Sequence, residues 1–201
     1  MKKNIQLDCW VAPAPVIIVS SGSMEGESNI ATFAWSGNIC SDPPMAYVSV
    51  RPERQTYKLI EETGEFVLNL ATNSLVNEAD MCGMYSGKST DKWEKTGLEK
   101  EMASEVSTPL VVQCPVSVEC KVTQKIHLGS HDMFIGKIVA IDADEEYIDE
   151  YGRLKIDDAN LLSLVHTDYV PLGEKSAEMG FTIRKKTAPH QRKSSNFKSK
   201  E

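Results

Sequence analysis

The sequence lacks the patterns that mark several large functional classes. Its five cysteines form no CxxC pair, and their odd number does not suit a secreted disulfide framework. No apolar run approaches the roughly 20 residues that a membrane-spanning helix needs. There is also no nucleophile elbow, P-loop or G-x-G-x-x-G loop. These absences argue against common zinc motifs, an integral membrane protein and a dedicated dinucleotide-binding fold.

The composition is that of an ordinary globular chain. Its 201 residues suit one large domain, and 41% of them are hydrophobic and 25% charged. Asp8 interrupts the N-terminal region before any continuous apolar stretch, so a signal peptide is not expected. We expect the cysteines to be small buried thiols without disulfide partners, as is typical of proteins in a reducing compartment. We therefore expect a cytoplasmic protein without a membrane segment.

Charge divides the chain into two parts. The net charge is −7, but residues 184–201 hold seven Lys or Arg against one Glu, which leaves 15 basic and 28 acidic residues in 1–183. We predict a domain over 1–183 and a basic, disordered tail over 184–201. The tail could contact nucleic acid or an acidic partner, or be simply solvated. The acidic body argues against a nucleic-acid-binding domain.

Strand patterns dominate the sequence. Apolar runs and alternation, separated by Gly and Pro turns, predict many strands at close spacing, with short helices over 56–63 and 74–85 and a helical turn over 91–95. Such a pattern indicates a mainly β fold, either a barrel or a sandwich. The expected strands cover 15–21, 30–42, 45–51, 65–72, 116–129 and 131–144, with a further β segment in 161–173. Cys114 and Cys120 are expected on one strand, too far apart for a disulfide or a shared metal.

The stretch MAYVSVRPERQTYKLI, residues 45–60, predicts a strand, a basic connection and a helix. Alternation places Ser49 and Arg51 on the strand face opposite the apolar one. Arg54 follows, and Thr56 stands where the helix should begin, beside free backbone N–H groups. Two cations and two hydroxyls at a helix N-terminus suit a phosphate. Because Ser and Arg are common on outer strand faces, a solvated strand edge with a capping Thr remains the alternative.

Residues 29–36, NIATFAWS, alternate small and large side chains. Ala31 and Ala34 would let a planar ligand approach the backbone, whose N–H and C=O groups could pair with a uracil-like edge. Trp35 offers a flat apolar face. The alternative is that Phe33 and Trp35 belong to the barrel core.

Three further polar residues are candidates. Lys92 in STDKW would cover the remaining side of a phosphate dianion as a point charge, although a lysine in a polar loop is usually solvated. His127 and His131 lie four residues apart beside Asp132, but a third metal ligand is missing nearby, so no metal site is assigned. His131 could donate to a bound ring or face solvent in its turn.

Read together, these residues resemble the flavin reductase-like, FMN-binding split-barrel family. The matching pieces span roughly residues 10–173, and their order and spacing carry the likeness. They are PAPVIIVSS, NIATFAWSGNICSDPPMAYVSV, RPERQTYKLIEETGEFVLNL, SGKSTDKWEKTGL and GSHDMFIGKIV. The resemblance implies a six-stranded antiparallel Greek-key barrel, and a homodimer with one non-covalent FMN per subunit near the interface.

The resemblance also implies which residues contact the cofactor. His131 would lie close to the flavin, Lys92 would reach the phosphate or ribityl region, and Leu164 stands where the family often carries an aromatic residue. That departure puts ring stacking from this segment in question. The isoalloxazine and ribityl chain would be lined, largely by backbone groups, by Asn29, Ile30, Ala31, Thr32, Phe33, Ala34 and Trp35. The phosphate would be held by the segment Ser49, Val50 and Arg51 together with Thr56.

The implied function is redox chemistry through FMN. The likeness is greatest to family members that carry electrons, which favours an electron carrier with a redox partner protein. The alternative is an NAD(P)H-dependent flavin reductase, in which the nicotinamide stacks transiently over the flavin. A flavin-free or non-enzymatic β-barrel that binds a small ligand is the alternative of another class. No catalytic residue is assigned.

Overall fold

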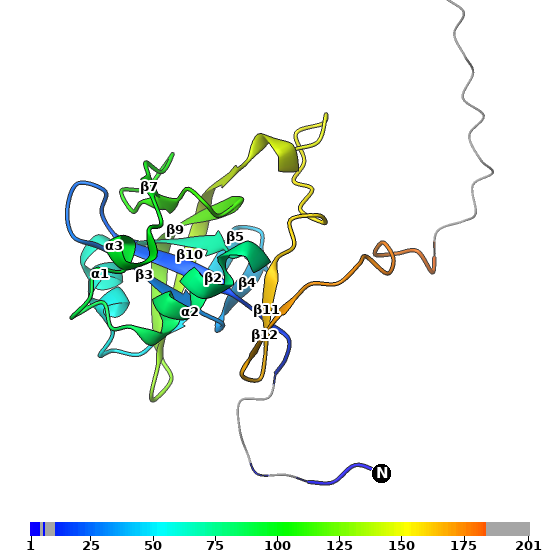
Figure 1. Ribbon diagram of the computed structural model, residues 1–201, viewed down its shortest axis with the longest axis horizontal. Helices are drawn as coiled ribbons and strands as arrows, with labels where there is room; N and C mark the ends of the chain where they lie inside the picture. Colours follow the sequence, from blue (N-terminus) through cyan, green and yellow to red (C-terminus); the bar gives the residue numbers. More distant parts are fainter. Residues whose placement is uncertain (5, 7–10, 184–201) are drawn as a thin grey trace, which may run out of the picture.

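The computed structural model describes residues 1–4, 6 and 11–183, so the predicted basic tail over 184–201 lies outside the described residues. Figure 1 shows strands at the centre of the molecule, with α1, α2 and α3 around them and a long β9–β10 hairpin whose tip projects at the bottom of the view. Within the described residues, no helix is long and apolar enough to cross a membrane.

One antiparallel sheet of seven strands forms the body of the fold, in the order β3-β2-β6-β9-β10-β5-β4. A three-stranded sheet, β1-β11-β12, and a two-stranded sheet, β7-β8, lie outside it. The seven strands are β2 (Ile17–Gly22), β3 (Ser28–Phe33), β4 (Ser36–Ser41), β5 (Pro44–Val50), β6 (Glu65–Leu70), β9 (Val116–His127) and β10 (Asp132–Ala143). The others are β1 (Ala14–Pro15), β7 (Lys100–Glu101), β8 (Leu110–Val111), β11 (Leu162–Val165) and β12 (Asp168–Pro171).

The sheet closes into a barrel at a bend. The two strands at the ends of its order, β3 and β4, follow each other in the chain with only Ala34 and Trp35 between them. Taken as one bent strand, they pair with β2 on one side and β5 on the other, which gives six strands around a closed barrel. Since β6 returns beside β2 after the β2–β3/β4–β5 meander, the topology is a Greek key. The predicted fold is confirmed.

The apolar run at β2 is buried on both faces, as its sequence predicted. Ile17 and Val19 belong to the cluster inside the barrel, with Phe66 and Phe134 among its members. Val16 and Ile18 belong to a second cluster, which the helices and β11 cover. This second cluster packs α2 and β11 against the outside of the barrel, where β2 and β3 lie.

The helices begin and end where local sequence signals stand. Helix α1 (Gln55–Thr63) ends at Gly64, whose φ of 69° is the left-handed cap conformation. Helix α2 (Val76–Met84) follows the 3₁₀ turn η1 (Asn73–Leu75). Helix α3 (Lys92–Thr96) begins after Asp91, whose carboxylate accepts from the Trp93 and Glu94 backbone N–H groups. A second 3₁₀ turn, η2 (Glu145–Tyr147), follows β10.

Two local expectations differ from the structure. Cys114 does not share a strand with Cys120, because β9 begins only at Val116, and the two thiols lie in different apolar clusters. The segment 161–173 forms a hairpin, β11–β12, that turns at His166. Its residues alternate across that turn, so sequence periodicity alone did not reveal the reversal.

Candidate functional site

A cleft of about 470 Å³ runs along β3, and we call it the β3 cleft. Its walls come from β3, the end of β5, the start of α1, the α2–α3 loop and the β11–β12 hairpin. It contains twelve of the fourteen predicted site residues, drawn from both halves of the chain. Those twelve are Asn29, Ala31, Thr32, Phe33, Ala34, Trp35, Ser49, Arg51, Thr56, Lys92, His131 and Leu164.

The other two predicted residues have side chains elsewhere. Ile30 packs in the outer apolar cluster, and Val50 packs inside the barrel, both with no exposed surface. Strand alternation explains this, because each lies between residues that face the cleft. Any contact they make with a ligand must come from their backbone groups, and that part of their predicted role stays a prediction.

One end of the β3 cleft carries flat and apolar surfaces. Trp35 is 43% exposed, and the His131 ring meets it edge-on with centroids 4.7 Å apart. The Ser49 backbone N–H donates to the Trp35 carbonyl at 2.9 Å, which fixes the β3–β4 bend against β5. Burial, together with the nearby Arg51 cation, lowers the pKa of His131, so this ring is held in its neutral form near pH 7.

The other end is polar and closely packed. The Asn29 amide donates to the Thr56 hydroxyl at 3.0 Å, and both residues are buried. Gly87 faces the same amide: a Cβ there would lie 2.2 Å from the Asn29 Oδ1. Only glycine permits this approach, so the α2–α3 loop can form the wall opposite β3.

Lys92 lies at this polar end and is buried, although it comes from a polar sequence. Its side chain donates to the Cys82 carbonyl at 2.6 Å, and the residue is only 5% exposed. Burial lowers the pKa of Lys92 from 10.5 to about 8. Cys82 opposes this shift in part, and the Arg54 cation adds a lowering effect that is smaller than either. The solvated-loop alternative for Lys92 is therefore wrong.

The charged groups of the cleft all have one sign. Arg51, Arg54 and Lys92 line it, and no Asp or Glu does so among the described residues. Arg51 has a distant ion partner, Glu53, at 3.9 Å, and both side chains are about half exposed or more. A chain of net charge −7 thus contains a cleft with cationic walls. Such walls suit an anionic ligand.

Several lining residues were not among the predicted site residues. Arg54 lay in the basic connection that sequence analysis identified, while Gly83 and Gly87 lie in or near SGKST, one of the matching pieces. His166 and Thr167 of the β11–β12 hairpin gave no signal, because their approach to the cleft depends on tertiary packing. The additional lining residues are Val11, Ala12, Ala14, Arg54, Gln55, Cys82, Gly83, Tyr85, Ser86, Gly87, His166 and Thr167.

Leu164 does line the cleft, from β11, and packs on the outer apolar cluster with Tyr169. Its aliphatic side chain cannot stack as an aromatic ring would. The aromatic residues that line the cleft within the described chain are Phe33, Trp35 and Tyr85. An aromatic surface in this site therefore comes from β3, from the β3–β4 bend and from the residue after α2.

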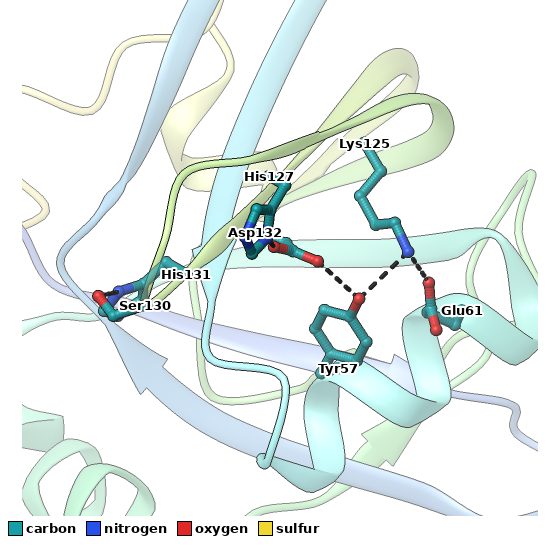
Figure 2. Close-up of polar contacts among 7 residues, drawn as sticks. All are labelled: Tyr57, Glu61, Lys125, His127, Ser130, His131 and Asp132. Carbon is teal, nitrogen blue, oxygen red and sulfur yellow. Dashed lines mark hydrogen bonds and ion pairs between the residues drawn. The ribbon is translucent and has the colours of Figure 1, made fainter.

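A separate polar network, which we call the Asp132 network, lies on the other side of the turn that carries His131 (Figure 2). The Asp132 carboxylate accepts from the Tyr57 hydroxyl at 2.7 Å and lies 2.6 Å from the His127 Nδ1. Lys125 donates to the Tyr57 hydroxyl and pairs with Glu61. These contacts join β9, β10 and α1, and so fix the turn from which His131 points towards Trp35.

The histidines do not gather metal ligands. Within residues 1–4, 6 and 11–183, no group of three or more His, Cys, Asp or Glu side chains could hold a metal ion. His127 and His131 belong to different surroundings, since His127 contacts Asp132 and the His131 Nδ1 contacts the Ser130 hydroxyl at 2.9 Å.

A flavin mononucleotide fits the chemistry of these walls. Buried Lys92 without an acidic partner, the Thr56 and Ser49 hydroxyls, and two arginines suit a phosphate. The small side chains of Ala31 and Ala34 beside Trp35 suit a planar ring system. Gly87 lets the α2–α3 loop pack closely against Asn29 at the polar end of the cleft.

Comparison with known proteins supports the same interpretation, that the cleft binds a flavin. The family model described as "flavin reductase like domain" matches residues 11–166. The chain belongs to the flavin reductase-like family. Its function is therefore flavin-related redox chemistry, and its expected cofactor is a flavin.

Among the similar solved structures are two flavoredoxins and a nitroreductase. Flavoredoxin of Desulfovibrio vulgaris (Miyazaki F) is 30% identical with a TM-score of 0.84, covering 92% of this chain and 100% of its own. Flavoredoxin from Methanosarcina acetivorans is 26% identical with a TM-score of 0.82, covering 90% and 97%. The 2-nitrobenzoate 2-nitroreductase of Pseudomonas fluorescens is 25% identical with a TM-score of 0.77, covering 89% and 90%.

Proposed function

We propose that the chain is an FMN-binding redox protein that carries electrons, as the name flavoredoxin implies for its structural neighbours. The observation that supports this most directly is the β3 cleft itself, whose described walls hold three cations and no carboxylate. A neutral small ligand would not need such walls. A flavin with a phosphate group would use them.

Each wall has a role in holding the cofactor. Ser49, Arg51, Thr56 and Lys92 would bind the phosphate, since they supply hydroxyl and charged donors. The backbone and small side chains of 29–35 would lie along the ribityl chain and ring, with His131 beside the ring. Bound FMN supplies one- and two-electron redox chemistry, while the protein supplies position and electrostatics.

Electron carriage is favoured over substrate turnover by three features. The sequence has no dinucleotide-binding loop, and Leu164 removes one aromatic wall that could stack with a nicotinamide. Residues 1–183 carry 15 basic against 28 acidic residues, an acidic body that could steer a basic redox partner. Rates with such a partner should fall as ionic strength rises.

A homodimer is part of the same proposal. Trp35 lines the cleft from the β3–β4 bend, and Ile39 lies on β4; both side chains are exposed to a similar degree. A twofold contact there would cover apolar surface and close the site. Sedimentation should give roughly twice the 22.3 kDa chain mass, whereas an FMN-loaded monomer at micromolar concentration would contradict this part.

An NAD(P)H-dependent flavin reductase is the second candidate. The similarity to a nitroreductase supports it, and so does a cleft rim formed by Tyr85, His166 and Thr167, which lies beyond the residues proposed for FMN. Stopped-flow mixing with NADH and NADPH separates the two. Bleaching of the flavin within seconds, followed by turnover with free FMN, would favour the reductase.

The cofactor itself is tested by release. Purified protein should be yellow, and denaturation should release FMN that chromatography distinguishes from riboflavin and FAD. A colourless protein that also fails to quench the fluorescence of added FMN would overturn the proposal. In that case a flavin-free binding barrel becomes the better description.

A further inference from the structure

Lys92 is the buried charged group that the proposed phosphate contacts do not fully explain. Its ammonium is carried by the first residue of α3 and donates to the Cys82 carbonyl near the end of α2. Because Lys92 is only 5% exposed, its ammonium can form few hydrogen bonds with water. A lysine in such a position loses hydration and gains only one neutral acceptor.

The charged surroundings of Lys92 do not compensate its charge. Arg54, at the N-cap of α1, repels it. On α2 the titratable neighbour is Cys82, with Glu78 beyond it, and β3 offers no titratable side chain. On α3 itself, the Asp91 carboxylate is engaged by two backbone N–H groups. Burial brings the pKa of Lys92 down to about 8, with Cys82 opposing the shift in part and Arg54 adding slightly to it.

We propose that Lys92 and Arg54 form a proton-linked anion site, in which Lys92 takes up a proton when the phosphate dianion of FMN binds beside it. The inference rests on the proposed function and deepens it: it adds Arg54 to the binding residues and couples cofactor affinity to pH. The proton comes from the buffer acid, and the dianion then provides the acidic partner that the protein lacks.

The coupling has a definite direction. In the ligand-free protein, Lys92 is largely neutral above pH 8, because burial and, to a much smaller extent, Arg54 disfavour its charge. A phosphate dianion within contact distance favours the ammonium, so binding must be accompanied by net proton uptake. A phosphate monoester has its second pKa near 6, and is already a dianion above pH 7.5. Protons taken up there belong to the protein.

Isothermal titration calorimetry of the full chain, freed of flavin, measures this uptake. FMN is titrated at pH 8.5 in two buffers of different ionisation enthalpy, and the difference in heat gives the protons bound. A lysine with a pKa of about 8 predicts uptake of about three quarters of a proton per FMN at pH 8.5 and about a quarter at pH 7.5. Riboflavin, which lacks the phosphate, should show none.

Two variants separate this proposal from a purely structural role. Lys92→Arg keeps a permanent charge, so it should retain FMN binding but lose the uptake at pH 8.5. Arg54→Gln removes the repelling cation, so the lysine should be more fully protonated before binding. Its FMN affinity should fall severalfold and its proton uptake at pH 8.5 should also fall. Lys125→Met, outside the cleft, should leave the uptake unchanged.

The outcomes are distinct. FMN binding by the parent chain with no proton uptake at pH 8.5 would overturn the proton-linked site while leaving the FMN proposal intact. Uptake that persists in Lys92→Arg would assign it to another group and would also overturn the inference. Failure of FMN to bind at all would overturn both proposals.

Discussion

Two lysines show how differently this fold treats a positive charge. Lys125, in the Asp132 network, is partly exposed, pairs with Glu61 and donates to the Tyr57 hydroxyl, and these contacts raise its pKa. Lys92, in the β3 cleft, is buried, faces Arg54 and donates to a neutral carbonyl, and its pKa falls to about 8. The first charge is compensated inside the protein, and the second is not.

The difference separates structural charge from functional charge. The Asp132 network satisfies its donors and acceptors among β9, β10 and α1, and so contributes to the fold (Figure 2). A cation buried without an acidic partner costs stability in the free protein. Its retention is explained if a ligand supplies the missing negative charge. We therefore expect mutation of Lys92 to change both flavin binding and stability, and mutation of Lys125 to change either one little.

The largest expected effect is on FMN affinity. Lys92→Met should weaken FMN binding by about 10- to 100-fold, about 1.5–3 kcal/mol, because it removes a charge-assisted hydrogen bond to phosphate. Riboflavin binding should hardly change. Lys125→Met is the matched control and should bind both flavins like the parent chain. Fluorescence quenching measures the six affinities of the parent and the two variants, and an equal loss for both flavins in Lys92→Met would contradict a phosphate role.

The same substitution should stabilise the free protein. Moving the pKa of Lys92 from 10.5 to about 8 corresponds to about 3 kcal/mol, of which about 1 is lost again with the hydrogen bond to Cys82. We expect flavin-free Lys92→Met to be about 2 kcal/mol more stable than the parent at pH 7 in urea unfolding. A variant that is less stable than the parent at pH 7 would contradict this prediction, because the charge of Lys92 would then already be compensated in the flavin-free protein.

The stability difference between Lys92→Met and the parent should change with pH in a defined direction. Between pH 8 and pH 10.5 the unfolded lysine keeps the proton that the folded one has lost, so parent stability rises with pH relative to the variant. The advantage of Lys92→Met should therefore be full below pH 8 and shrink above it. Urea midpoints of both proteins at pH 7, 8.5 and 10 measure this trend.

The sequence predicted those features of the fold and of the β3 cleft that depend on local patterns. The alternation at 45–51, the helix start at Thr56 and the Gly64 stop are short-range features. The Gly64 stop is confirmed, whereas the helix begins one residue earlier, at Gln55, and the strand ends one residue earlier, at Val50. The same alternation places Val50 inside the barrel and Ser49 in the cleft. Ile30, likewise, follows from the pleat of β3.

What sequence could not predict depends on distant packing. Gly87 approaches Asn29 across 58 positions of the chain, and Lys92 is buried with its ammonium bound to the Cys82 carbonyl of α2. Arg54 lay in a recognised basic segment, but nothing local showed that it would face Lys92. The Tyr57–Asp132 contact, with 75 positions between its partners, left no sequence signal.

A smaller effect is expected from acid titration of the Asp132 network. Hydrogen bonds from Tyr57 and then His127 lower the pKa of Asp132 below its usual 3.8. Its contribution to stability is therefore complete at neutral pH and is lost as pH falls below about 4. Asp132→Asn should be less stable than the parent at pH 7, and the difference should shrink in acid. A difference in melting temperature that is constant from pH 7 to pH 3 would contradict this.

The smallest effect should come from the exposed cation. Lys125→Met should change stability little, because exposed ion pairs contribute little and are screened by salt. Melting temperatures of the variant and the parent should converge as salt is added. A large loss at high salt would mean that Lys125 also packs structurally, as its stem over the Tyr57 ring would allow.

The most direct test of the central claim compares two ligands on the unmodified protein. Flavin-free chain is titrated with FMN and with riboflavin at pH 7.5 and low salt, and the two dissociation constants are compared. The account predicts that FMN binds at least tenfold more tightly and that the difference narrows as salt screens the phosphate contacts. Equal affinity for the two flavins would contradict it, because the cations of the β3 cleft would then have no phosphate to hold.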